Sequence, residues 1–164
     1  MQDPSLGANY LAFDIIGDLS FGAPFGMLEV AKDIAFVPKH HDNQQAVMNS
    51  YGKQEIDSEV HGIPAVQILN GRGEFSMSMG ALPPHWRSIV KHLPGYRFGG
   101  ECVRNLAGIA IVAVAKRLAN PTDRIDLLNK LQNSRDADGN LMGREELTAE
   151  AQTLLIAGSD TTSK

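Results

Sequence analysis

The residues from Ala157 to Thr162 read AGSDTT, and they place an acid and two adjacent threonines directly after an apolar run. Asp and Thr are mediocre helix formers, and Gly in a helix interior costs about 1 kcal/mol relative to Ala. One interpretation is that a helix ends here, with Gly158 as its C-cap. The other is a helix that passes close to a flat ligand, where Gly158 allows a close backbone approach. Asp160 and Thr161 could then relay protons.

Helical spacing precedes this segment and predicts the element that must position it. A helix is expected to begin near Gly143, with acids in its first turn, and to run to the end of the chain. Its apolar residues fall close to one face, which predicts that this face is buried. They are Leu147, Ala151, Leu154 and Leu155.

Other helices are expected over residues 9–22, about 101–118 and 124–136. In the first, Leu11, Ile15, Ile16 and Leu19 form an apolar stripe, and Asp14 and Asp18 lie on another.

The middle of the chain carries a weaker signal. Residues 63–69 could be helix or strand, followed by a turn at Asn70-Gly71. Residues 71–100 predict an irregular connection with one helical turn after Pro83-Pro84. No hairpin is evident, so the predicted fold class is mainly α with four or five helices.

Composition narrows the class of protein. The chain has 164 residues, 43% hydrophobic and 21% charged, which indicates one globular domain with a core. A net charge of −4 argues against a nucleic-acid partner. The longest near-apolar run, Leu106 to Ala115, is shorter than the roughly 20 residues that span a bilayer. His40-His41-Asp42 lacks an evident third ligand, so no metal site is predicted.

The AGSDTT segment resembles the A/G-G-x-D/E-T-T/S signature in the central helix of cytochromes P450. The preceding acidic loop, capped helix start and Leu-rich approach, DADGNLMGREELTAEAQTLLI, are similar to those of fungal members. Upstream, NYLAFDIIGDLSFGAPFGML resembles the segment before the family's mobile lid helices. PAVQILNGRGEFSMSMGALPP and VRNLAGIAIVAVAKRL resemble the lid region and following helix of the fungal benzoate 4-monooxygenase group. The resemblance implies a partial cytochrome P450 domain over residues 1–164.

That resemblance implies roles for the last helix. Ala157 and Gly158 would line the distal face of a haem, and Thr162 would support a helix distortion beside it. Thr161 would hydrogen-bond the iron-bound oxygen, and Asp160 would help to deliver protons. The complete enzyme would insert one oxygen atom of O2 into a small aromatic acid such as benzoate, by ring hydroxylation. Electrons would come from NADPH through a P450 reductase, at the cytosolic face of the endoplasmic reticulum membrane.

The sequence also departs from the family pattern. The haem-binding Cys loop, the downstream E-x-x-R motif and the membrane-anchoring helix are not recognisable, and Cys102 in GGECVRNL is not such a loop. We therefore expect an internal fragment that is inactive alone and either soluble or aggregating. The alternative hypothesis is a non-catalytic helical interaction module or a pseudogene product, with the terminal Ser/Thr cluster as a frayed cap.

Overall fold

The computed structural model describes residues 4–40, 43–52, 59–121, 123–135 and 139–162, without the side chains of 4–5 and 160–162. The described residues are mainly α, as predicted, and hold eight helices where four or five were expected. Within them the elements, in chain order, are α1 (Pro4–Phe21), α2 (Met27–Val30), β1 (Ala35–Pro38), α3 (Asn43–Asn49), β2 (Val60–Ile63), α4 (Ala65–Gly80), α5 (Pro84–Val90), α6 (Pro94–Ala119), α7 (Leu127–Asn133) and α8 (Arg144–Thr162).

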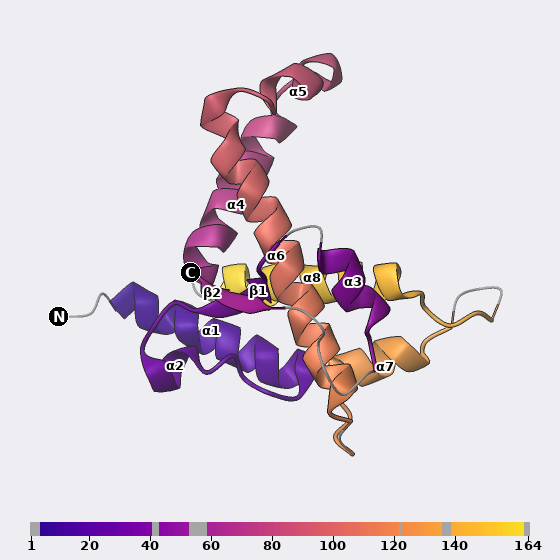
Figure 1. Cartoon of the computed structure of the whole chain (residues 1–164). Helices are drawn as coiled ribbons and strands as arrows, with labels where there is room; N and C mark the ends of the chain where they lie inside the picture. The colour runs from indigo at the N-terminus through magenta and orange to yellow at the C-terminus, as the bar shows by residue number, and fades with distance from the viewer. Residues whose placement is uncertain (1–3, 41–42, 53–58, 122, 136–138, 163–164) are drawn as a thin grey trace.

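Two regions are visible in Figure 1. The body holds α1, α8, α7, α3, the two strands and the C-terminal part of α6. The arm, residues 72–98, consists of the C-terminal part of α4, α5 and the start of α6, and it projects from the body with α5 at its tip. Because α6 belongs to both regions, it connects the arm to the core.

The core of the body is built around α6 and α8. Leu106, Ala110 and Val114 recur at helical spacing on α6 and are fully buried. Ala151 and Leu155 on α8 are fully buried as well, and α8 packs against both α6 and α1. The helix predicted from Gly143 and its buried face are therefore confirmed.

Most of the apolar stripe of α1 is exposed to solvent, whereas other apolar residues of the same helix are buried. Leu11, Ile15 and Leu19 are exposed, whereas Phe13 is buried and Ile16 is partly buried against the core. The helix therefore packs through a face adjacent to the stripe, and the stripe itself faces outward.

The prediction of a turn at Asn70-Gly71 is wrong, because α4 continues through both residues. Gly71 serves a close contact with α6: a Cβ there would lie 2.7 Å from the Cys102 sulfur. Gly99 of α6 makes the reciprocal contact, since its Cβ would lie 2.5 Å from Phe75 Cβ. These glycines let two helices approach closely. Helices α4, α5 and α6 together cover most of residues 71–100, so the prediction of an irregular connection is wrong.

The sequence did not reveal the small sheet. Strands β1 and β2 pair antiparallel from Ala35 opposite Ile63 to Pro38 opposite Val60. Each strand has only four residues, too few for alternation to stand out. Ala35 and Val37 are buried, and β1 packs against α6.

By length and composition, α6 could cross a membrane, and it is the one such helix among the described residues. Its most apolar window is 61% buried inside the molecule, and the core helix of a soluble protein has the same properties. This helix is therefore weak evidence for a membrane span.

Candidate functional site

The end of α8 carries the predicted site. The helix continues through Thr162, so the interpretation of Gly158 as a C-cap is wrong. Gly158 faces α1, and a Cβ there would lie 2.5 Å from Ile16 Cδ1 and 3.0 Å from Ile16 Cβ. The close backbone approach that this glycine allows is therefore made to a neighbouring helix.

A second face of α8 is exposed and lined by small side chains. Ala149, Thr153 and Ala157 follow one another at four-residue spacing, and all three are exposed. The Thr153 hydroxyl donates a hydrogen bond to the Ala149 carbonyl at 3.0 Å, within the same helix. Position 161 comes four residues after Ala157 in the same helix. The side chains of Asp160, Thr161 and Thr162 lie outside the described residues.

The opposite side of the motif is packed. Ser159 is buried, and its hydroxyl has no hydrogen-bond partner among the described residues. Ser159 and Gly158 therefore hold this turn of α8 inside the molecule, while Ala157 faces outward.

A buried carboxylate of α1, the helix that packs against α8, holds the chain segment that follows α1. Asp14 accepts hydrogen bonds from the backbone N–H groups of Gly26, Met27 and Leu28, at 2.8, 3.1 and 2.9 Å. Charge-assisted bonds of this kind are strong, so they tie the segment after α1 back onto the helix. The sequence showed Asp14 only as part of a polar stripe, because its partners come from a segment 12 or more residues away.

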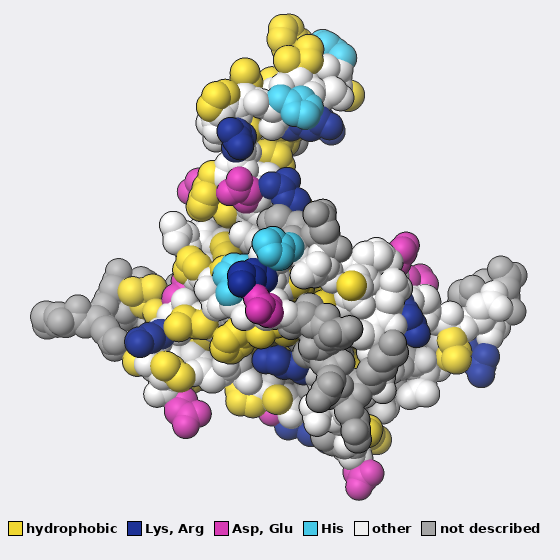
Figure 2. All heavy atoms as spheres, viewed as in Figure 1, with side chains coloured by type: hydrophobic (Ala, Val, Ile, Leu, Met, Phe, Trp, Pro, Cys, Tyr) yellow, Lys and Arg dark blue, Asp and Glu magenta, His cyan; other side chains and the backbone are white. Residues whose placement is uncertain are grey.

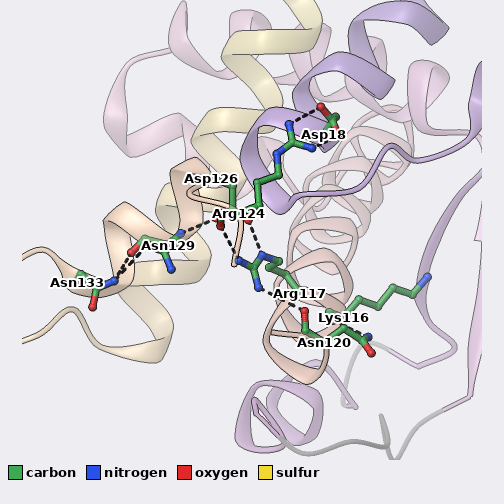
Figure 3. A network of polar contacts seen from close by, with 8 residues as sticks. All are labelled: Asp18, Lys116, Arg117, Asn120, Arg124, Asp126, Asn129 and Asn133. Atoms are coloured by element: carbon green, nitrogen blue, oxygen red, sulfur yellow. Dashed lines mark hydrogen bonds and ion pairs between the residues drawn. The ribbon is translucent and has the colours of Figure 1, made fainter. Parts of the chain in front are cut away.

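Two ion pairs connect the ends of α1 and α6 to the segment that leads into α7 (Figure 3). Arg117 of α6 pairs with Asp126 at 2.5 Å, and their side chains are only 7% and 0% exposed. Asp126 also caps α7 by accepting a hydrogen bond from the Asn129 N–H at 2.7 Å. The exposed pair joins Asp18 to Arg124 through two bonds of 2.7 and 2.6 Å, and the Arg124 hydrogen bond lowers the pKa of Asp18.

Cys102, the single cysteine of the chain, lies at the contact between α4 and α6 and is 1% exposed. Burial, followed by the charges of Glu101 and Glu74, raises the pKa of its thiol. The thiol is therefore packed between two helices and is not open to a ligand.

The structure tests only part of the prediction that His40-His41-Asp42 forms no metal site. His41 and Asp42 lie outside the described residues. Among the residues that are described, no group of three or more His, Cys, Asp or Glu side chains is placed to hold a metal ion.

The body also contains a pocket of about 450 Å³ away from α8. It lies between the end of α1, β1 and the C-terminal part of α6. No residue of α8 lines it. The lining residues are Phe21, Gly22, Ala23, Pro24, Phe25, Phe36, Ile109, Val112, Ala113, Lys116, Arg117 and Asn120.

Comparison with known proteins gives consistent matches. The chain is 48% identical to benzoate 4-monooxygenase bphA of Aspergillus niger, in an alignment of 162 positions that covers 94% of the chain. It is 26% identical, again over 94% of its length, to averantin hydroxylase of Dothistroma septosporum and to cytochrome P450 monooxygenase astA of Talaromyces wortmannii.

The chain spans only about a quarter of these relatives, 28%, 24% and 25% of their respective lengths. No protein-family model and no solved structure matches it. The three relatives share one class of chemistry in their names, and the first is close in sequence along nearly the whole chain. Along nearly its whole length, the chain is therefore similar to one part of these larger proteins, and the third of them is named a cytochrome P450 monooxygenase.

Proposed function

We propose that this chain is the central part of a haem-thiolate monooxygenase and carries its oxygen-activating helix. The observation that carries the proposal is the AGSDTT motif on an unbroken α8, in a chain 48% identical to a benzoate 4-monooxygenase. The substrate is a small aromatic acid such as benzoate, hydroxylated on its ring. We infer that substrate from the first relative's name and from the segments of this chain that resemble the benzoate 4-monooxygenase group.

The described residues fit a haem on one side only. The exposed row of Ala149, Thr153 and Ala157 offers a surface of small side chains against which a flat group can lie. Cys102 does not fit the role of thiolate ligand, because it is buried between two helices. The ligand would have to be a different cysteine. When bound, the haem would supply reduction of O2 and transfer of one oxygen atom to the substrate.

The chain's own residues would leave room for the bound groups and supply protons to the reaction. Ala157 leaves room on the exposed face of α8. Gly158 acts through its backbone, because a side chain there would meet Ile16. Asp160 and Thr161 provide a carboxylate and a hydroxyl on adjacent residues of the next turn, where they can hold and pass protons. Thr162 supports a local change in helix geometry through its hydroxyl.

The same proposal covers the surroundings of the complete protein. NADPH supplies electrons through a P450 reductase, and the enzyme lies at the cytosolic face of the endoplasmic reticulum membrane. These statements rest on the resemblance of the chain to cytochromes P450.

A segment exchange tests the proposal. The part of bphA that aligns with this chain would be replaced by the chain, and benzoate hydroxylation would be measured with NADPH and reductase present. We expect an active chimaera. Thr161→Val in that chimaera should lower product formed per NADPH and raise peroxide, while Thr161→Ser should retain most of the coupling.

Glu150→Gln is the control, because Glu150 is exposed on the same helix and lies outside the row of Ala149, Thr153 and Ala157. It should leave coupling near that of the parent chimaera. An inactive chimaera that binds haem normally would contradict the proposed activity of this segment. Unchanged coupling in Thr161→Val would contradict the role of Thr161 alone.

A further inference from the structure

We propose that the pocket between α1, β1 and α6 binds a small monocarboxylate with an apolar body, whose carboxylate pairs with Lys116. This site goes beyond the proposed monooxygenase function, because no residue of α8 contributes to it. Its ligand would bind on the body of the molecule, separately from the oxygen-activating helix.

The size and walls of the pocket suit a small organic molecule. Its volume of about 450 Å³ falls in the range of roughly 300–1,000 Å³ common for such sites. Phe21 and Phe25 meet edge to face, with ring centroids 6.3 Å apart, and Phe36 of β1 contributes a third ring. Ile109 and Val112 of α6 are buried and form the apolar floor. Aromatic and aliphatic walls of this kind favour the apolar part of a ligand.

The polar groups of the pocket are cationic or neutral. Arg117 and Lys116 are its charged lining residues, and no acidic side chain lines it. The Arg117 guanidinium is already bound to Asp126. Figure 3 shows Lys116 extending away from that pair. Its ammonium lies 4.7 Å from the centroid of the Phe36 ring.

Lys116 is therefore the group that can receive an anion. The Lys116 side chain reaches solvent, and partial loss of hydration against its neighbours lowers its pKa, because the charged form is then less stable. An incoming carboxylate would replace that lost hydration with a charge-assisted hydrogen bond. A cationic ligand would meet the like charge of Lys116, so the anion is the favoured class.

The test uses a matched pair of probes on the whole chain, 4-phenylbutanoate and 4-phenylbutan-1-ol. Dissociation constants would be measured by isothermal titration calorimetry, and methyl resonances of Ile109 and Val112 would locate the binding site by NMR. We expect the acid to bind about tenfold more tightly than the alcohol, as expected for one charge-assisted bond near a protein surface.

Lys116→Met should remove that preference and leave the acid and the alcohol with similar affinities. Lys130→Met on α7, outside the pocket, is the control and should keep the preference. Equal binding of the two probes by the unmodified chain would overturn the proposal. So would acid binding that leaves the Ile109 and Val112 methyl resonances unshifted, or a preference that survives in Lys116→Met.

Discussion

The body and the arm of this molecule are stabilised in different ways. The body buries long apolar side chains, including Leu106 and Leu155, which are fully covered. In the arm, Met77 is 79% exposed and Ile89 is 60% exposed, and α5 has no buried residue. Figure 2 shows hydrophobic, basic and histidine side chains together on the surface of the projecting tip.

This difference indicates that the arm depends on its contacts with the body for its stability. Its helices are held near their base by the close contacts of Gly71 with Cys102 and of Gly99 with Phe75. Further out, Phe75 and Tyr96 meet edge to face, with centroids 6.2 Å apart. Substitutions in the body should therefore alter the free energy of unfolding of the whole chain, whereas substitutions at the exposed tip should alter it little.

The largest effect is expected from Asp126→Ala in the body. Removing this carboxylate leaves the buried Arg117 guanidinium without its counter-ion and removes the cap of α7. Breaking a buried pair in this way costs about 3–5 kcal/mol. Urea unfolding followed by far-UV circular dichroism measures the loss.

Asp18→Ala is the control for that change, because it breaks an ion pair with Arg124 on the surface of the same region. Its effect should be much smaller, since solvent screens exposed pairs. Equal losses in the two variants would show that Arg117 is stabilised by other groups when Asp126 is absent.

A cavity in the core should have the next largest effect. Leu155→Ala removes a fully buried side chain from α8, and changes of this kind cost about 2–5 kcal/mol. The matched change in the arm is Ile89→Ala, whose side chain is 60% exposed; we expect it to stay within about 0.5 kcal/mol. The comparison would fail if Ile89→Ala destabilised the chain as strongly as Leu155→Ala.

The same contrast explains which elements were predictable. The helices of the body, α1, α6, α7 and α8, bury one face in the core, and their apolar spacing predicted each of them. The predicted C-terminal ends of α1 and α6 and the start of α8 are correct to within one residue, but α1 begins five residues and α6 about seven residues earlier than predicted. In the arm, exposed apolar side chains obscure the spacing. Glycines that mark turns in most sequences serve helix contacts there, so Gly71 misled the prediction.

The candidate site was predictable to the extent that it depends on a local motif. The segment from Ala157 to Thr162 could be identified because its residue types are adjacent in the sequence. The contact of Gly158 with Ile16 joins segments more than 140 residues apart, and the Asp14 bonds to Gly26 and its neighbours cross a loop. Neither contact has a local pattern, because each depends on how α1 packs in the folded chain.

Two glycine substitutions separate helix propensity from packing. Gly158→Ala should destabilise the chain by about 1–2 kcal/mol, because overpacking against Ile16 outweighs the gain in helix propensity. Gly73→Ala in the arm has no atom within 4 Å of its new Cβ, so it should stabilise α4 by about 0.5–1 kcal/mol. Thermal unfolding should therefore shift in opposite directions. A stabilising Gly158→Ala would contradict the close contact between α8 and α1.

The smallest effect is expected from Tyr51→Phe, which removes a buried hydroxyl of the body. Tyr51 and Thr148 share a hydrogen bond of 2.7 Å, and its loss costs about 1 kcal/mol at pH 7. Tyr96→Phe in the arm is the matched control and should change the unfolding free energy less, because its ring contact with Phe75 remains.

The pH dependence of the unfolding free energy, compared between the unmodified chain and Tyr51→Phe, is a more specific test. Burial raises the pKa of Tyr51 from 10.0 to about 12, opposed in part by the Thr148 hydrogen bond and the charge of Arg144. A group whose folded pKa is raised contributes stability that is complete below its unfolded pKa and is lost as the pH rises through the folded value. The advantage of the unmodified chain over Tyr51→Phe should therefore be constant up to about pH 9 and decline between pH 10 and 12. Urea unfolding across that range measures it, and an advantage that persisted unchanged at pH 12 would show that Tyr51 ionises alike in the folded and unfolded chain.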